Sequence, residues 1–148
     1  MTRPIRFGTD GVRGLAGQWP ITEEGAERIG RGIATWVEGG RVLIGRDTRE
    51  SGPALQAALS RGLMRGGSTA VDLGILPTAA VSTAVAADPS AKAGVMLTAS
   101  HNPWTDNGIK VVNSCGEKPS NTTDLVTCFS HPVDRPGGRE SAHPDPLS

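Results

Sequence analysis

The chain has 148 residues and a mass of 15.3 kDa, which is enough for one domain with its own hydrophobic core. Its 15 Lys and Arg balance its 15 Asp and Glu, which argues against a polyanion-binding protein, so we expect no nucleic-acid partner. No apolar run approaches the length of a membrane helix, and the first residues contain no apolar stretch typical of a secretory signal. We therefore expect no membrane partner and a cytoplasmic location.

Strand and helix signals alternate along residues 1–112. Thr22 is a typical helix N-cap, because its hydroxyl can accept a backbone hydrogen bond and two glutamates follow it. Leu55, Leu59 and Leu63 recur at helical spacing and are predicted to face the core. In chain order, the sequence predicts a strand at 5–7, a helix from Thr22 that ends at Gly39 and Gly40, a strand at 41–44, a helix from Ser51 that ends at Gly66 and Gly67, a strand at 69–73, a helix at 78–87, and strands at 94–97 and 108–112.

This alternation predicts an α/β fold, with a largely parallel sheet and helices on both faces. In such sheets, ligands bind beyond the carboxyl ends of the strands. Four polar loops lie at predicted strand ends, at 8–14, 45–49, 74–78 and 98–107. We therefore expect the functional site to be built from these loops.

The residues of these loops indicate phosphoryl chemistry. Two of the loops carry arginines, which suit bidentate contacts to phosphate, and the last carries Ser100, His101 and Asn102 in succession. Common nucleotide and hydrolase motifs are not found. The glycines at 8–14 do not follow the order of a dinucleotide-binding loop, no Walker loop is present, and no nucleophile elbow surrounds Ser100.

The same loop residues also have purely structural interpretations. Residues 100–103 are typical of a turn, because serine and Asn-Pro favour turns. Arg46 and Arg49 could form surface ion pairs with Asp47 and Glu50. The loop residues alone do not decide between these alternatives and a phosphate site.

Four segments together resemble the first domain of the α-D-phosphohexomutase superfamily. Residues 7–14 (FGTDGVRG) are similar to the opening signature of bacterial phosphoglucosamine mutases, and residues 98–103 (TASHNP) are similar to the phosphoserine loop of the superfamily. Residues 45–49 (GRDTR) and 106–110 (DNGIK) match further family segments in order and spacing. The resemblance covers about residues 3–118 and implies a three-layer α/β/α domain at 1–118.

The resemblance also implies a site. Ser100 would carry a phosphoryl group between glucosamine 6-phosphate and glucosamine 1-phosphate, with glucose and mannose phosphates as alternative substrates. His101 and Lys110 are the candidates for proton transfer. The other expected site residues are Arg13, which would contact the transferring phosphate, and Asn102, Thr9 and Arg46, which would shape the loop or bind substrate phosphate.

The family's Mg²⁺ joins the phosphoserine to an Asp-Gly-Asp-x-Asp-Arg loop of a second domain, so Ser100 would contact the metal only through its phosphate. Third and fourth domains bind the sugar hydroxyls and the distal phosphate. Residues 119–148 contain no such aspartate loop and depart from the family toward proline and serine, as a shifted reading frame or a fused segment would. We predict a mostly disordered tail there.

The resemblance therefore implies that domains II–IV of the family are partners that this chain lacks. Without them, the chain is expected to have negligible mutase turnover and to self-associate through an exposed domain interface. A function of a different class is also possible: the chain could be a non-catalytic remnant or interaction module whose Ser100 is never phosphorylated. Phosphate uptake at Ser100 separates the two.

Overall fold

The computed structural model describes residues 3–8 and 11–142. It contains a six-stranded sheet with the strand order β1-β5-β4-β2-β3-β6. The strands are β1 (Val12–Leu15), β2 (Gly40–Arg46), β3 (Ser68–Ile75), β4 (Ala91–Leu97), β5 (Asp106–Asn113) and β6 (Arg139–Ala142). The helices are α1 (Glu23–Trp36), α2 (Gly52–Arg65), α3 (Thr78–Ala87) and α4 (Thr122–Ser130).

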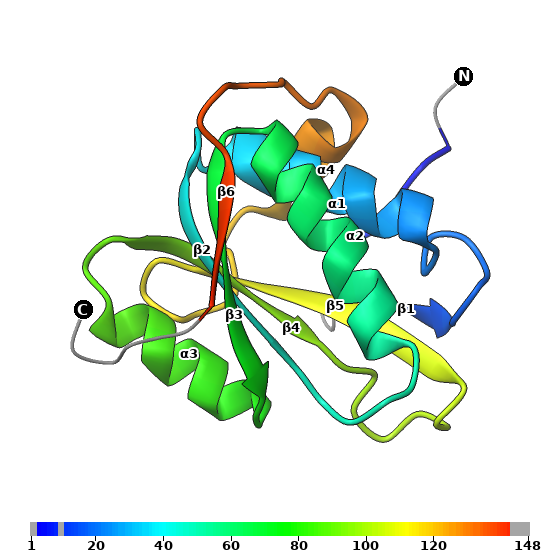
Figure 1. Cartoon of the computed structure of the whole chain (residues 1–148). Helices are drawn as coiled ribbons and strands as arrows, with labels where there is room; N and C mark the ends of the chain where they lie inside the picture. The colour runs from blue at the N-terminus through cyan, green and yellow to red at the C-terminus, as the bar shows by residue number, and fades with distance from the viewer. Residues whose placement is uncertain (1–2, 9–10, 143–148) are drawn as a thin grey trace.

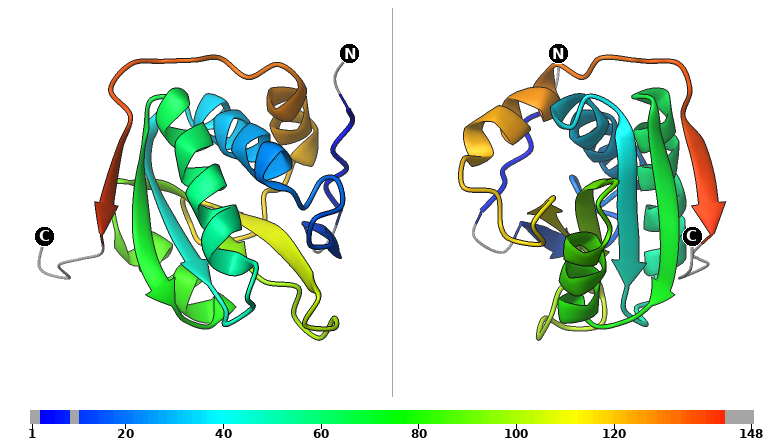
Figure 2. Two further views of the ribbon diagram at one scale, coloured as in Figure 1. Left: turned by 45° about the vertical axis from the view of Figure 1, so that its right-hand side comes forward. Right: turned by 90° about the vertical axis from the view of Figure 1, so that its left-hand side faces the viewer.

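Helices cover both faces of the sheet. Helices α1 and α2 pack together over one face, and α3 covers the other (Figures 1 and 2). The larger hydrophobic core lies on the α1 and α2 side and contains Leu55, Leu59 and Leu63 as predicted, whereas a smaller core lies beneath α3. The arrangement confirms the predicted α/β fold. No helix of the described residues is long and apolar enough to span a membrane.

The sheet is mixed, and its topology gathers the polar loops. Strand β2 pairs in parallel with β3 and β4, and β6 pairs in parallel with β3, whereas β5 is antiparallel to both β4 and β1. Strands β2, β3 and β4 therefore end at one edge of the sheet. The loops at 45–49, 74–78 and 98–107 leave from that edge, where α/β sheets bind their ligands.

The boundaries of helices α1, α2 and α3 agree with the sequence signals, whereas the strands β2 to β5 are each longer than predicted. The Thr22 hydroxyl caps α1 by accepting a hydrogen bond from the Gly25 amide at 2.9 Å, and α3 spans the predicted residues 78–87. The strand predicted at 5–7 is wrong. Residues 5–7 belong to no strand, and the chain joins the edge of β5 only from Val12 onward.

The C-terminal segment requires a larger correction. Residues 119–142 were predicted to be mostly disordered, but they form α4 and β6 and run across one end of the domain (Figure 2). Leu125 and Phe129, one helical turn apart, are fully buried against the core, and Asn121 caps α4 through its side chain. Asp134 then pairs with Arg31 at 2.9 Å. Two well-placed apolar side chains thus order a segment of polar composition; residues 143–148 of the predicted tail lie outside the described residues.

Asp88, at the C-terminal end of α3, gives the fold an acid-sensitive contact. Its carboxylate accepts hydrogen bonds from the Ser90 hydroxyl at 2.7 Å and from Arg41 Nε at 2.8 Å. These bonds, led by the one from Ser90, lower the pKa of Asp88 from 3.8 to about 2. A carboxylate with a lowered pKa stabilises the folded state above its unfolded-state pKa, and this contribution is lost as the pH falls through the folded value.

We expect Asp88→Asn to lower the free energy of unfolding at pH 7 by about 1–2 kcal/mol. The difference between the variant and the wild-type chain should shrink as the pH falls from 3.8 toward about 2, because the wild-type carboxylate is then protonated. Urea unfolding at a series of pH values measures this. A difference that does not change with pH would contradict the assignment.

Candidate active site

Ser100 lies in the loop between β4 and β5, at the carboxyl edge of β4. The residue is exposed, and its φ of 56° lies in the left-handed region that serine rarely adopts. A non-glycine residue keeps this conformation only where its surroundings hold it. The contacts of the loop therefore determine how Ser100 is presented.

Hydrogen bonds hold the loop on both sides of Ser100. The Ser100 amide donates to Thr98 Oγ1 at 3.0 Å, and the Thr98 hydroxyl donates to the carboxylate of Asp47 at 2.6 Å. The Asn102 side-chain amide donates to Asp106 Oδ2 at 3.1 Å, which closes the loop on its other side. Asn102 is thus positioned to shape the loop.

Arg49 lies against the same loop, with its side chain only 10% exposed. Its Nε donates to Asp47 Oδ2 at 3.1 Å, which is one of the ion pairs considered from the sequence. Its remaining donors bond to main-chain carbonyl oxygens of residues 100–106. These contacts cannot be predicted from the sequence, because every residue type has the same main-chain carbonyl group.

Lys110 and Arg13 share the sheet face that α3 covers. Arg13 of β1 stands opposite Gly108 of β5, and Lys110, two residues further along β5, stands opposite Met96 of β4. Residues opposite each other across a ladder, or two positions apart in a strand, project to one face. Because Met96 belongs to the core beneath α3, that core identifies the face.

Arg46 lies on the other face of the sheet. It alternates along β2 with Val42 and Ile44, which belong to the core under α1 and α2. Its Nη1 donates to Gln56 of α2 at 2.6 Å, and the same nitrogen is 3.9 Å from the carboxylate of Asp72. These contacts tie β2 to its neighbours, and the structure does not bring Arg46 to the face that carries Lys110.

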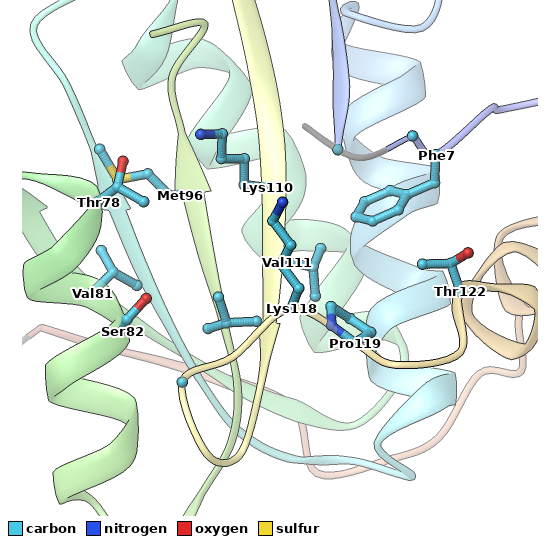
Figure 3. A pocket seen from close by; sticks show the side chains of 14 residues that line it. Phe7, Thr78, Val81, Ser82, Met96, Lys110, Val111, Lys118, Pro119 and Thr122 are labelled. Atoms are coloured by element: carbon cyan, nitrogen blue, oxygen red, sulfur yellow. The ribbon is translucent and has the colours of Figure 1, made fainter.

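A cavity of about 600 Å³ opens beside Lys110. Lys118 also lines it, together with Phe7 and with Thr78 and Ser82 of α3 (Figure 3). No carboxylate occurs among the described residues that line this cavity, so its two ammonium groups favour an anionic ligand. Sequence patterns missed Lys118, because it lies in the irregular segment between β5 and α4, which no recognised motif marks.

The other two expected site residues differ in what the structure shows of them. His101 is exposed next to Ser100 in the loop. Thr9 lies outside the described residues. No group of three or more His, Cys, Asp or Glu side chains that could hold a metal ion occurs in the described part of the chain.

The fold and the loop segments match a known family of enzymes. The family model described as "Phosphoglucomutase/phosphomannomutase, alpha/beta/alpha domain I" matches residues 4–128. The chain belongs to this family. The match confirms the family indicated by the loop segments, and it extends beyond residue 118 into α4.

Three members illustrate how this mutase-family chain compares with its relatives. It is 47% identical over 115 residues to a phosphoglucosamine mutase of Desulforapulum autotrophicum, covering 76% of this chain and 25% of the relative. It is 46% identical over 147 residues to a phosphoglucosamine mutase of Symbiobacterium thermophilum, covering 93% and 33%. A solved phosphoglucomutase/phosphomannomutase family protein from Burkholderia thailandensis matches with a TM-score of 0.77 and 28% identity, covering 89% of this chain and 31% of that one. The chain therefore spans between a quarter and a third of the length of these relatives.

Proposed function

We propose that this chain is the phosphoserine domain of a hexose-phosphate mutase that interconverts glucosamine 6-phosphate and glucosamine 1-phosphate, with Ser100 as the phosphoryl carrier. The observation that carries the proposal is the conformation of Ser100. It is exposed, left-handed and hydrogen-bonded in place, in the loop that joins β4 to the strand bearing Lys110. A nucleophile that must receive and return a phosphoryl group needs this combination of access and fixed position.

In the loading step, Ser100 Oγ attacks a phosphorus atom of a hexosamine bisphosphate. A bond forms between Oγ and phosphorus, the bond from phosphorus to the sugar oxygen breaks, and the hydroxyl proton passes to the departing sugar oxygen. Lys110 is the first candidate for this proton transfer, and His101, next to Ser100 in sequence, is the second. Arg13 adds positive charge on the face of Lys110, where it would stabilise the transferring phosphoryl oxygens.

The preference for glucosamine phosphates is supported by the relatives named phosphoglucosamine mutase. Glucose and mannose phosphates are the alternative substrates, since the family name covers both. The cavity beside Lys110 offers ammonium groups that suit any of these anions, so the sugar has to be identified by comparing the three bisphosphates as donors.

Magnesium is part of the same proposal. The described residues provide no cluster of carboxylates for the ion, so the contribution of this chain would be the phosphate oxygens of phospho-Ser100. The other ligands and the sugar contacts would come from domains II–IV of a full-length mutase. Bound there, the ion would neutralise phosphoryl charge.

Intact-mass measurement tests the proposal. We expect the chain, after incubation with glucosamine 1,6-bisphosphate and Mg²⁺, to gain the mass of one phosphoryl group. The Ser100→Ala chain should gain none, because the nucleophile is missing. The alternative of a non-catalytic remnant predicts that neither chain changes in mass, and equal uptake by both chains would place the phosphate elsewhere.

A further inference from the structure

Arg49 uses every donor that a guanidinium has. The group carries five N–H bonds in a fixed planar fork, and each of the five finds an acceptor. Nε bonds to the carboxylate of Asp47 at 3.1 Å. The other four bonds go to main-chain carbonyl oxygens, those of Pro103 (2.5 Å) and Asp106 (3.1 Å) from Nη1, and those of Ser100 (2.9 Å) and Asn102 (3.1 Å) from Nη2.

These bonds close a ring around Ser100. Its carbonyl oxygen is bonded to Arg49, Arg49 is bonded to Asp47, Asp47 accepts from Thr98, and Thr98 accepts from the Ser100 amide. Both peptide groups of Ser100 are therefore held by one connected network. Since a left-handed serine is unfavourable by itself, the network opposes relaxation of Ser100 to an ordinary conformation.

We infer that Arg49 is a positioning residue, which holds Ser100 in the left-handed conformation from which it accepts a phosphoryl group. The inference deepens the proposed function and rests on it for the transfer step. Arg49 does not touch the reacting atoms; it acts through the backbone of residues 100–106. Because the Arg49 side chain is only 10% exposed, removing it would take a donor from the carbonyl oxygens of Ser100 and Asn102 and would leave the Asp47 carboxylate without its ion pair.

Lysine cannot replace this arginine. Its ammonium group has three donors on a single nitrogen atom and no planar fork, so it cannot reach acceptors on both sides of the loop. Arg49→Lys keeps the positive charge and the ion pair with Asp47 but loses most carbonyl contacts. Comparing Arg49→Lys with Arg49→Ala thus distinguishes the effect of the lost carbonyl contacts from the effect of the lost positive charge.

The experiment compares wild-type, Arg49→Lys, Arg49→Ala and Arg41→Ala chains. Arg41→Ala is the matched control, because Arg41 also forms a partly buried ion pair, with Asp88, but contacts no residue of the loop. Three quantities are measured for each chain: the thermal unfolding midpoint, hydrogen exchange of the Ser100 and Asn102 amides, and the initial rate of phosphoryl uptake from glucosamine 1,6-bisphosphate. Arg49→Ala is also assayed with added guanidinium chloride at a concentration that does not denature it.

In both Arg49 variants, the Ser100 and Asn102 amides are expected to exchange faster than in the wild-type chain, and the rate of phosphoryl uptake is expected to fall by about tenfold or more. In Arg41→Ala, the exchange rates and the uptake rate should stay at the wild-type level. Guanidinium is expected to restore part of the uptake of Arg49→Ala. Wild-type exchange and uptake in a folded Arg49→Lys chain would overturn the inference, as would equal losses in Arg41→Ala. If the wild-type chain takes up no phosphate, the proposed function fails, and the exchange comparison then decides whether Arg49 holds the loop.

Discussion

Gly62→Ala is expected to lower the free energy of unfolding by about 3 kcal/mol or more, although alanine is the better helix former. Helices α1 and α2 touch through glycine. A methyl group on Gly62 would collide with the backbone of α1 at Glu27 and Arg31, and one on Gly30 would collide with the backbone of α2 at Leu59. Because backbone cannot rotate away as a side chain can, the two helices would have to separate, which opens the larger core between them and the sheet.

Urea unfolding of Gly62→Ala and Gly14→Ala measures this effect with a matched substitution. A methyl group on Gly14 would make only an ordinary contact with the Ile21 side chain at 3.6 Å, so that chain should unfold close to the wild-type midpoint. A Gly62→Ala chain as stable as Gly14→Ala would show that α1 and α2 are not in close contact.

Lys110→Ala is expected to slow phosphoryl uptake at Ser100 by about a hundredfold or more, the range typical of a lost acid or base. The reason is its position on β5, on the same face as Arg13 and lining the cavity. Removing an ammonium group also weakens the attraction of the cavity for anions, so this contribution has to be measured separately.

Lys118→Ala provides the comparison, since Lys118 lines the same cavity from the segment between β5 and α4. It should raise the concentration of bisphosphate needed for half-maximal uptake while changing the maximal rate much less than Lys110→Ala does. Equal effects of the two substitutions on the maximal rate would indicate that Lys110 contributes only charge. An unchanged rate in Lys110→Ala would exclude it from the transfer step.

Local signals in the sequence predicted the central elements well because each has a physical cause close by in the chain. The Thr22 hydroxyl caps α1, and Leu55, Leu59 and Leu63 face the core at helical spacing. The strand signals likewise placed Ser100 in the loop between β4 and β5. The bounds of β4 and β5 were predicted too short, because their first residues do not differ in composition from the turns beside them.

Contacts between distant segments could not be predicted in this way. Arg46 follows Val42 and Ile44, but both faces of β2 are buried, so hydrophobic alternation does not reveal which face Arg46 occupies. Arg49 bonds to carbonyl oxygens that any sequence would supply. Residues 119–148 were predicted to be mostly disordered because of their average composition. An average does not show that a single side chain, Phe129, packs against the core.

Transfer of a phosphoryl group between sugar phosphates by Ser100 is the step on which the proposed function depends. A chase measures this directly: the chain is loaded with radiolabelled phosphate from glucosamine 1,6-bisphosphate, freed of donor, and mixed with unlabelled glucosamine 6-phosphate and Mg²⁺. We expect the label to leave Ser100 and to appear in glucosamine 1,6-bisphosphate. Label that stays on the chain, or that appears only as inorganic phosphate, would contradict the proposed function.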